Sequence, residues 1–452
     1  MKYIFSFIFI LIASLVSIAQ INSDYKEIDA LVKTNAMIDA LDAASLLKKN
    51  HQKDTADSEY WLRYSQVNTV LYKYEDARFA INKAIRLEPK PNYYFEKGLL
   101  FNRINLLDTA LAALETAVAL KEEGEYYYWK GIVNQQMGNG QAALQDYRAA
   151  LTHKFETAEM QNNLSILLIE SKKFEEALSH INKAILLDNN YAQAYGTKAK
   201  IQLCLFQVDS ACSANATAFA LGFRKIMNIP DSVCKGSFIQ QTQYVADVCA
   251  GNGYYERAIV GYSKLIDKQV LKSDYFLNRG YCYYQLKEYS KADADYLKAL
   301  TLPQVSFDMV YNNLSLLYFD QMNYTKSAEY ATKRIELNPL NYVAYLDRGL
   351  AYRKMGSFKE AEKDYEKSIS LKPDFFRAYA YKAFLYLLQN KFEKALELSS
   401  TAIQLNPKYG YAYLVRAQVK QKLDISDFCL DYYAAKTYQE ADATEAIRLY
   451  CK

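Results

Sequence analysis

The sequence predicts an all-α protein built from repeated pairs of helices, and three observations carry this prediction. Glycine (15 residues) and proline (7) are scarce in a chain of 452 residues that is 51% apolar, which favours helices over turn-rich structure. Pro339, Pro373 and Pro407 lie 34 residues apart, and each ends a phrase of the form Ile-x-Leu-x-Pro. Between these prolines, apolar residues recur at helical spacing on two stretches of about a dozen residues. Each 34-residue unit is therefore expected to be a helical hairpin.

Small residues recur at fixed places within these units. Ala361 and Ala395 each stand twelve residues before a proline of the series, and Gly349, Ala383 and Ala417 are again 34 residues apart. In an antiparallel helix pair the backbones approach most closely where the side chains are small. These positions are therefore predicted to lie where the two helices of a unit cross.

The pattern resembles the tetratricopeptide repeat, which has aromatic residues at positions 4, 11 and 24, small residues at 8, 20 and 27, and proline at 32. Residues 342–375 match best, through Tyr345, Gly349, Tyr352, Ala361, Tyr365 and Pro373. Further repeats are expected to start at residues 58, 91, 124, 158, 192, 239, 273, 308, 376 and 410, and residues 24–57 fit weakly as a degenerate first repeat or N-terminal cap. The resemblance implies a right-handed α-solenoid of stacked helix pairs with a concave inner surface.

Four cysteines indicate an internal duplication. Cys212 and Cys234 are 22 residues apart, as are Cys429 and Cys451, and the two pairs are offset by 217 residues (429 − 212 and 451 − 234). The sequence therefore predicts two tandem arrays of about six helix pairs, at residues 20–236 and 237–452. Each array is expected to end in a cysteine-bearing cap.

Both cysteine pairs are predicted to form disulfides. Residues equidistant from the turn of an antiparallel helix pair face each other, and the midpoints of the two pairs fall near Gly222 and at Glu440. The alternative is that all seven cysteines are small buried apolar residues, which is the interpretation adopted for Cys204, Cys249 and Cys282. A metal site is disfavoured because neither pair has a CxxC motif or a nearby histidine.

The N-terminus has the pattern of a secretory signal peptide. Lys2 precedes an uncharged run from Tyr3 to Ile18, and the small residues Ser17 and Ala19 suit signal peptidase. Cleavage after Ala19 is expected, so that residues 1–19 are a signal peptide. A retained membrane anchor is the alternative, although a run of about 16 residues is short for a bilayer. The mature protein is thus predicted to be exported to a bacterial periplasm or beyond, with no transmembrane segment.

Charge and motifs exclude several classes of function. With 55 basic and 51 acidic residues the net charge is +4, so the basic footprint of a nucleic-acid binder is missing. The three histidines are scattered, and the sequence contains no GxGxxG, GxxxxGK[ST], HExxH or GxSxG motif. We therefore expect neither catalysis nor a cofactor or metal.

The resemblance implies a binding groove lined by the first helix of each repeat. The candidate groove residues in the second array are Leu277, Tyr281, Tyr284, Asn312, Asn313, Phe319, Arg353, Arg377, Tyr381 and Phe384. Those in the first array are Phe95, Asn102, Tyr128 and Asn163, in a more polar setting that includes Glu96, Arg103 and Trp129. The alternative is that these side chains only pack between neighbouring repeats.

The predicted function is a non-catalytic scaffold or adaptor that binds a protein or peptide partner in the cell envelope. Exposed tyrosines offer apolar area with a polar tip, and amides bond a peptide backbone. A glycan- or cell-wall-binding protein is the alternative, with Tyr281, Tyr284 and Tyr381 as sugar-stacking platforms.

Overall fold

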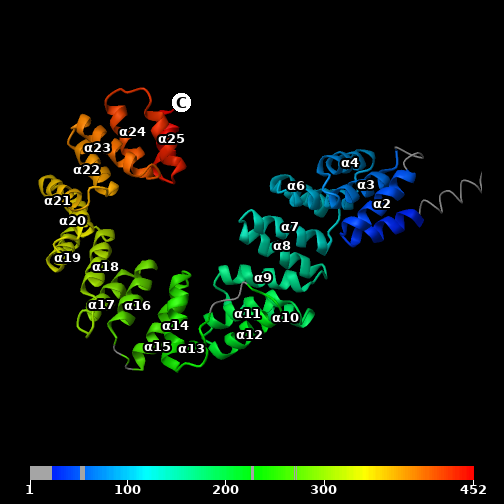
Figure 1. Cartoon of the computed structure of the whole chain (residues 1–452), viewed down its shortest axis with the longest axis horizontal. Coiled ribbons are helices and arrows are strands. Elements are labelled where there is room, and N and C mark those ends of the chain that lie inside the picture. The colour runs from blue at the N-terminus through cyan, green and yellow to red at the C-terminus, as the bar shows by residue number, and fades with distance from the viewer. Residues whose placement is uncertain (1–22, 51–55, 225–228, 269, 271, 452) are drawn as a thin grey trace, which may run out of the picture. The chain divides into compact units, whose positions relative to one another are not determined.

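The computed structural model describes residues 23–50, 56–224, 229–268, 270 and 272–451. Within these residues every regular element is a helix and adjacent helices pair, so the predicted all-α architecture of helix pairs is confirmed. The chain divides into two units, Met1–Ile229 and Pro230–Lys452 (Figure 1). The predicted signal peptide lies outside the described residues.

The first unit consists of helical hairpins. A helix over residues 23–33 pairs with α2 (Met37–Asn50) in the segment expected to be a degenerate repeat or cap. The hairpins that follow are α3 (Ser58–Val70) with α4 (Tyr74–Leu87), α5 (Pro91–Arg103) with α6 (Leu107–Leu120), α7 (Gly124–Gln136) with α8 (Gly140–Thr152), α9 (Ala158–Glu170) with α10 (Phe174–Leu187), and α11 (Ala192–Cys204) with α12 (Val208–Ala220).

The second unit begins with the short helix α13 (Asp231–Cys234), which packs on α14. Its hairpins are α14 (Phe238–Gly251) with α15 (Tyr255–Asp267), α16 (Ser273–Gln285) with α17 (Tyr289–Ala299), α18 (Phe307–Asp320) with α19 (Tyr324–Leu337), α20 (Tyr342–Lys354) with α21 (Phe358–Leu371), α22 (Phe376–Leu388) with α23 (Phe392–Leu405), and α24 (Gly410–Lys422) with α25 (Phe428–Thr437), followed by α26 (Asp442–Tyr450).

The first array was expected to end at residue 236, in a full hairpin that carries Cys212 and Cys234. Instead, α13 is only four residues long and is grouped with the second unit. Pro230 stands immediately before α13 and Gly236 shortly after it, which limits this segment to a single helical turn.

The helices begin where the repeat pattern predicts. The first helix of each pair starts at the predicted residue, or one residue earlier for α14 and α18. The turn within a pair is set by one residue with positive φ, such as Gly356 (78°) after α20 and Met322 (60°) after α18. After α20, the Ser357 N–H donates to the Tyr352 carbonyl (2.9 Å), which closes this helix in a Schellman-type cap.

Within a hairpin, a glycine of the first helix packs against a tyrosine of the second. A Cβ atom added at Gly349 would lie 2.7 Å from the ring of Tyr365, and the contacts of Gly131 with Tyr147 and Gly280 with Tyr296 are equally close. These tyrosines are fully buried. The structure thus confirms that the small residues mark the helix crossings, and it shows that these tyrosines are packing residues.

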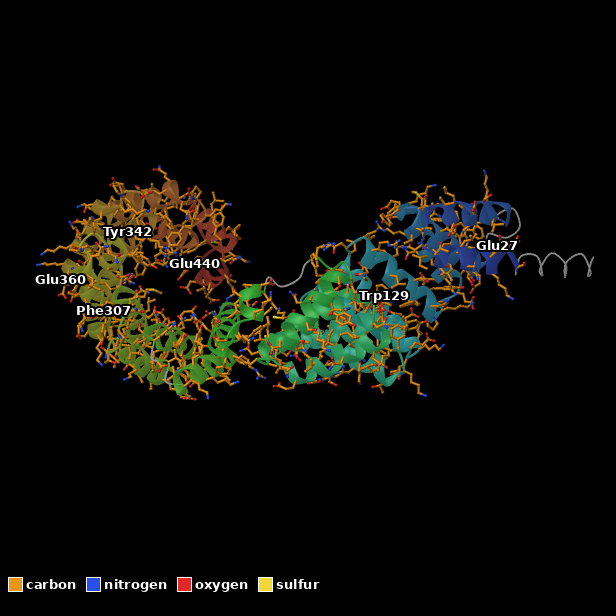
Figure 2. The ribbon with its side chains drawn as sticks, turned by 60° about the horizontal axis from the view of Figure 1, so that its bottom comes forward. Glu27, Trp129, Phe307, Tyr342, Glu360 and Glu440 are labelled. Carbon is orange, nitrogen blue, oxygen red and sulfur yellow. A yellow bond between two sulfur atoms is a disulfide. The ribbon has the colours of Figure 1, made fainter. Side chains whose placement is uncertain are left out.

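First helices of successive pairs contact one another in both units. In the second unit α16 contacts α18, α18 contacts α20, α20 contacts α22, and α22 contacts α24. In a curved stack, the helices that touch across repeats lie on the inner side, because spacing is tightest there. In Figure 2, Glu360 of the second helix α21 accordingly projects from the outer rim of this unit, whereas Glu440 lies toward its inner side.

Candidate functional site

Four predicted groove residues of the second unit converge on one cavity of about 360 Å³. Phe319 comes from α18, Arg353 from α20, and Tyr381 and Phe384 from α22. Because these are first helices of consecutive pairs, the cavity opens on the surface that the repeats share. We call it the Arg353 cavity.

The walls of the Arg353 cavity are aromatic. The ring of Tyr411, on α24, lies 5.0 Å from that of Tyr381 and 6.1 Å from that of Phe384, measured between centroids. Burial raises the pKa of Tyr411 above its ordinary value, so its hydroxyl stays protonated and can donate a hydrogen bond. Rings of this kind provide a large apolar contact area at low cost in side-chain entropy.

Arg353 supplies an uncompensated positive charge to this cavity. Its guanidinium carbon lies 5.0 Å from the centroid of the Phe384 ring, and it forms no ion pair with any described residue. Its Nε atom is buried and has no hydrogen-bond partner among the residues described. Lys354 also lines the cavity, and Asp442 of α26 is its acidic residue. A ligand oxygen could therefore satisfy a donor that the fold leaves unpaired.

The cavity also contains residues that the sequence analysis did not select. Tyr411, Leu414 and Gln418 stand at positions 2, 5 and 9 of the repeat that starts at residue 410, which are groove positions in the tetratricopeptide pattern. Applying the pattern to that last repeat would have identified them. Asp442 follows the last repeat and carried no sequence signal.

The remaining candidates of the second array do not line this cavity. Leu277 is only 3% exposed and packs in the core. The Tyr284 hydroxyl donates to Asp320 (2.6 Å), and Asn312 Nδ2 donates to Asn313 Oδ1 (3.3 Å). Tyr281 and Arg377 are exposed.

The candidates of the first array are dispersed. Phe95 is 8% exposed and stacks on Tyr126, with ring centroids 4.6 Å apart. Tyr128 is half-buried beside Phe155, and burial raises its pKa to about 12. Asn163 is half-buried. Asn102 lines a cavity, which is described below.

That cavity, of about 370 Å³, lies between the helix over residues 23–33, α3, α5 and α7. We call it the Glu96 cavity. Besides Asn102, its lining includes Glu96, Arg103 and Trp129, which the sequence analysis had placed in the first groove. Figure 2 labels Trp129 among the helices of the first unit.

Comparison with known families identifies the repeat. Residues 342–375 match a family model described as the tetratricopeptide repeat, and residues 158–191 and 273–305 match a second model with the same description. Three segments of the chain therefore match the tetratricopeptide repeat. The matched segments coincide with the hairpins α20–α21, α9–α10 and α16–α17.

Solved structures of similar fold have low sequence identity to the chain, and no curated protein matches it. MamA from Desulfovibrio magneticus is 15% identical, with 38% of this chain and 98% of MamA covered and a TM-score of 0.35. Yeast Tom70 is 15% identical, with 87% of this chain and 95% of the Tom70 chain covered and a TM-score of 0.38. YrrB, described as a TPR protein with an unusual peptide-binding site, is 17% identical, with 40% of this chain and 93% of the YrrB chain covered and a TM-score of 0.35.

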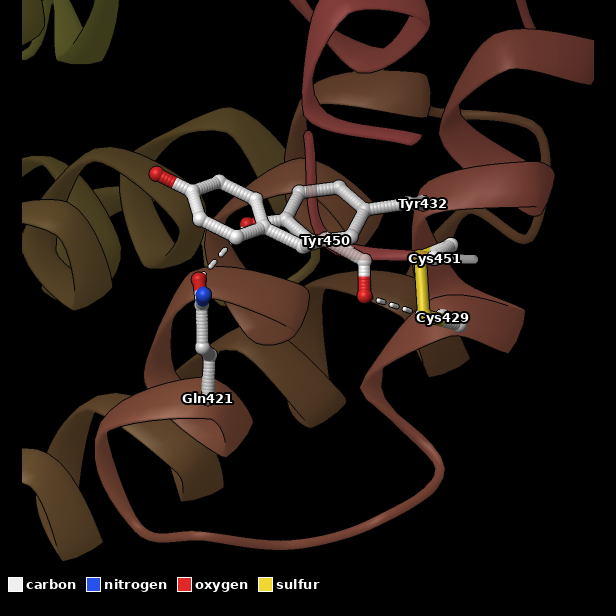
Figure 3. Close-up of a disulfide and its surroundings, with 5 residues drawn as sticks. All are labelled: Gln421, Cys429, Tyr432, Tyr450 and Cys451. Atoms are coloured by element: carbon white, nitrogen blue, oxygen red, sulfur yellow. Dashed lines mark hydrogen bonds between the residues drawn. A yellow bond between two sulfur atoms is a disulfide. The ribbon is translucent and has the colours of Figure 1, made fainter. Parts of the chain in front are cut away.

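A disulfide fastens the second unit at its C-terminal end. Cys429 of α25 is bonded to Cys451, directly after α26, with Cα atoms 5.6 Å apart (Figure 3). Beside the bond the rings of Tyr432 and Tyr450 stack, and the Tyr432 hydroxyl donates to Gln421 Oε1 (3.2 Å). Because α26 contributes Asp442 to the Arg353 cavity, the disulfide holds one wall of that cavity in place.

The other cysteines fall into two groups. Cys212 and Cys234 are also disulfide-bonded. Cys204, Cys249 and Cys282 are free and buried, as the sequence analysis expected for these three. Burial raises the pKa of the Cys282 thiol to about 12, which makes it unreactive at neutral pH.

Two kinds of feature are absent from the described residues. No cluster of three or more His, Cys, Asp or Glu side chains there could hold a metal ion. None of the described helices is long and apolar enough to cross a membrane.

Proposed function

We propose that the protein is a non-catalytic scaffold or adaptor of the bacterial cell envelope, which binds protein segments along the inner surfaces of its tetratricopeptide arrays. The observation that carries the proposal is the convergence of Phe319, Arg353, Tyr381 and Phe384 on one cavity. These residues come from three successive repeats, so an extended segment along the array meets all of them.

The chemistry of the Arg353 cavity specifies the segment that fits. Aromatic walls from Phe384, Tyr381 and Tyr411 favour a bulky apolar side chain. The positive charge of Arg353 and its unpaired Nε atom favour a nearby carboxylate, which an arginine can bind through two parallel hydrogen bonds. The proposed ligand is therefore a segment with an aromatic or large aliphatic residue next to Asp or Glu.

Two features support the cell-envelope location. The signal-like segment at residues 1–19 directs export, and four cysteines are in the disulfide-bonded form. Disulfides persist in the periplasm and outside the cell rather than in the cytosol. Mass spectrometry of the protein from the periplasmic fraction tests this location, and the proposal expects a mature N-terminus at Gln20.

Peptide selection tests the binding proposal. The full-length oxidised protein is used to select segments from a displayed peptide library, and the affinity of each selected segment is measured by calorimetry. We expect Phe384→Ala to weaken binding at least tenfold, because it removes a cavity wall. Tyr433→Ala is the matched control, since Tyr433 is an exposed aromatic residue on the second helix α25. Equal affinities for the two variants contradict the proposal.

Polysaccharides form the second arm of this experiment. Of the three tyrosines considered for glycan binding, only Tyr381 lines the Arg353 cavity, and the hydroxyl of Tyr284 is engaged by Asp320. We therefore expect peptide binding without glycan binding. The alternative function would be favoured if the protein binds cell-wall polysaccharide but no peptide, and if Tyr281→Ala abolishes the polysaccharide binding.

A further inference from the structure

The Glu96 cavity of the first unit differs in chemistry from the Arg353 cavity. Its apolar lining comes from Leu99, Leu100 and the indole of Trp129, and its polar lining includes the Glu96 carboxylate and the Asn102 amide. Both polar groups stand on α5, the first helix of its hairpin. The cavity therefore opens on the inner surface of this array.

The Glu96 carboxylate has no positively charged partner. Its Oε1 accepts one hydrogen bond, from Gln66 Nε2 of α3 (2.6 Å), and it forms no ion pair with any residue that the structure describes. Burial raises the pKa of Glu96 to about 7, and the nearby carboxylates of Glu125 and Asp29 act in the same direction. The fold thus holds a half-buried carboxylate without a positively charged partner.

Two arginines of the helices that form this cavity, Arg63 and Arg103, have other partners. Arg63 of α3 is paired with Asp29 and Glu59. Arg103, two helical turns after Glu96 on α5, donates to the Thr69 carbonyl (3.4 Å) and to Asn35 Oδ1 (3.2 Å). Neither guanidinium compensates the charge of Glu96.

A second acceptor in this cavity is also unsatisfied. Asn102 Oδ1 is buried and receives no hydrogen bond. A buried acceptor without a donor is costly, and a bound donor removes that cost. A carboxylate and an amide oxygen together require a ligand that donates hydrogen bonds and carries positive charge.

We propose that the Glu96 cavity binds a primary ammonium group on an aliphatic chain, such as the side chain of lysine. Glu96 supplies the compensating charge, Asn102 Oδ1 accepts a hydrogen bond, and the face of Trp129 offers a cation–π contact. Leu99 and Leu100 provide apolar contacts for the methylene chain. A metal ion fits less well, because the described residues provide no cluster of three ligands.

This inference is independent of the proposed function. It concerns the first unit, and it holds whether the ammonium group belongs to a protein segment or to a free amine. Failure of peptide selection at the Arg353 cavity leaves it intact, and its own failure leaves the function of the second unit untouched.

The binding must depend on pH in a defined direction. Only ionised Glu96 pairs with an ammonium group, and its pKa in the free protein is about 7. The ionised fraction therefore rises about tenfold between pH 6 and pH 8. We expect the affinity to rise by about the same factor and to fall with added salt.

The test uses the full-length oxidised protein and calorimetry at pH 6 and pH 8. The probes are Nα-acetyl-lysine amide, cadaverine as a free diamine, and Nα-acetyl-norleucine amide as an uncharged control. We expect binding of an ammonium probe but not of the norleucine probe. Preference for the lysine derivative identifies a protein segment as the source, and preference for cadaverine identifies a free amine. Equal binding of all three probes, or of none at pH 8, overturns the proposal.

Two variants and one control locate the binding site. Glu96→Gln keeps the shape and the Gln66 contact but removes the charge, and should weaken binding at least tenfold. Glu125→Gln removes a neighbouring exposed acid that does not line the cavity, and should bind within about twofold of the unmodified protein. If Glu96→Gln fails to fold, Asn102→Ala takes its place, because the Asn102 side chain makes no hydrogen bond in the free fold. Unchanged affinity in the variant tested contradicts the proposal.

Discussion

Arg348 and Asp364 face each other across the α20–α21 hairpin, with Nε and Nη2 of the arginine each 2.8 Å from one carboxylate oxygen. The same paired geometry joins Arg279 to Asp295. It recurs between Arg416 and Asp431 in the last hairpin. In each case the carboxylate is almost completely buried, so these ion pairs fix how the second helix sits on the first.

Removing one partner of such a pair should be costly. We expect Asp364→Ala to lower the free energy of unfolding by about 2–4 kcal/mol, because the Arg348 guanidinium is left largely buried without a counter-charge. Urea unfolding followed by circular dichroism measures the effect. Glu445→Ala is the control, since it breaks the exposed Arg448–Glu445 pair and should cause no measurable change. Similar losses for both variants would show that burial does not set the strength of these pairs.

The contact between Gly349 and Tyr365 predicts a second loss of stability. A methyl group at position 349 would lie 2.7 Å from the Tyr365 ring, which is fully buried and cannot move aside. Gly349→Ala should therefore destabilise the second unit by about 1–3 kcal/mol, despite the higher helix propensity of alanine. Gly251→Ala, where nothing lies within 4 Å of the added methyl, should be neutral or slightly stabilising. Thermal unfolding of the two variants checks this prediction. A Gly349→Ala protein as stable as the unmodified protein would contradict the close contact between Gly349 and Tyr365.

Reduction of the Cys429–Cys451 disulfide should release α26. The bond closes a loop of 22 residues, and in the chain-entropy account its loss costs about 3 kcal/mol. Hydrogen exchange of residues 442–450 in a Cys429→Ser/Cys451→Ser variant should be faster than in the oxidised protein. Exchange of α22, remote from the bond in sequence, serves as the internal control and should remain unchanged. Equal protection of α26 in both proteins would show that packing alone holds this helix.

The raised pKa of Glu96 predicts how the stability of the first unit changes with pH. Its pKa in the fold is about 7, above the ordinary value of 4.5, so the folded protein binds a proton that the unfolded chain releases. This contribution to stability is complete below pH 4.5 and is lost as the pH rises through 7, at a cost of about 3 kcal/mol. Glu96→Gln should match the unmodified protein at pH 4.5 and exceed it at pH 8 in urea unfolding. Parallel pH profiles for the two proteins would contradict the buried position of the carboxylate.

The helix pairs could be predicted from the sequence because their packing residues recur. Gly349 and Tyr365 belong to the repeat pattern, and so do their equivalents in other hairpins. The ion pair of Arg348 with Asp364 recurs only in some hairpins, so periodicity alone did not reveal it. The short helix α13 was missed because the duplication implied a full hairpin around Cys234, where Pro230 and Gly236 allow one turn.

The candidate site could be predicted only in part. Repeat positions located Phe319, Arg353, Tyr381 and Phe384, which share a cavity. The same positions also selected Leu277 and Phe95, which lie in the core, because position 5 faces the neighbouring repeat as much as the groove. The unpaired state of Arg353 and the contribution of Asp442 depend on tertiary contacts, so no repeat pattern reports them.

The central claim is that Arg353 binds an acidic side chain of the protein segment. Reversing the charge of each partner tests this claim most directly. A selected segment and its Asp→Lys or Glu→Lys counterpart are titrated against the unmodified protein, Arg353→Glu, and the control Lys359→Glu on the second helix α21. We predict that the Arg353→Glu variant binds the acidic segment at least tenfold more weakly than the unmodified protein does, a loss of about 1.4 kcal/mol in binding free energy. The same variant should bind the lysine counterpart more tightly. Lys359→Glu should change neither affinity. Unchanged preference for the acidic segment in Arg353→Glu would contradict the account.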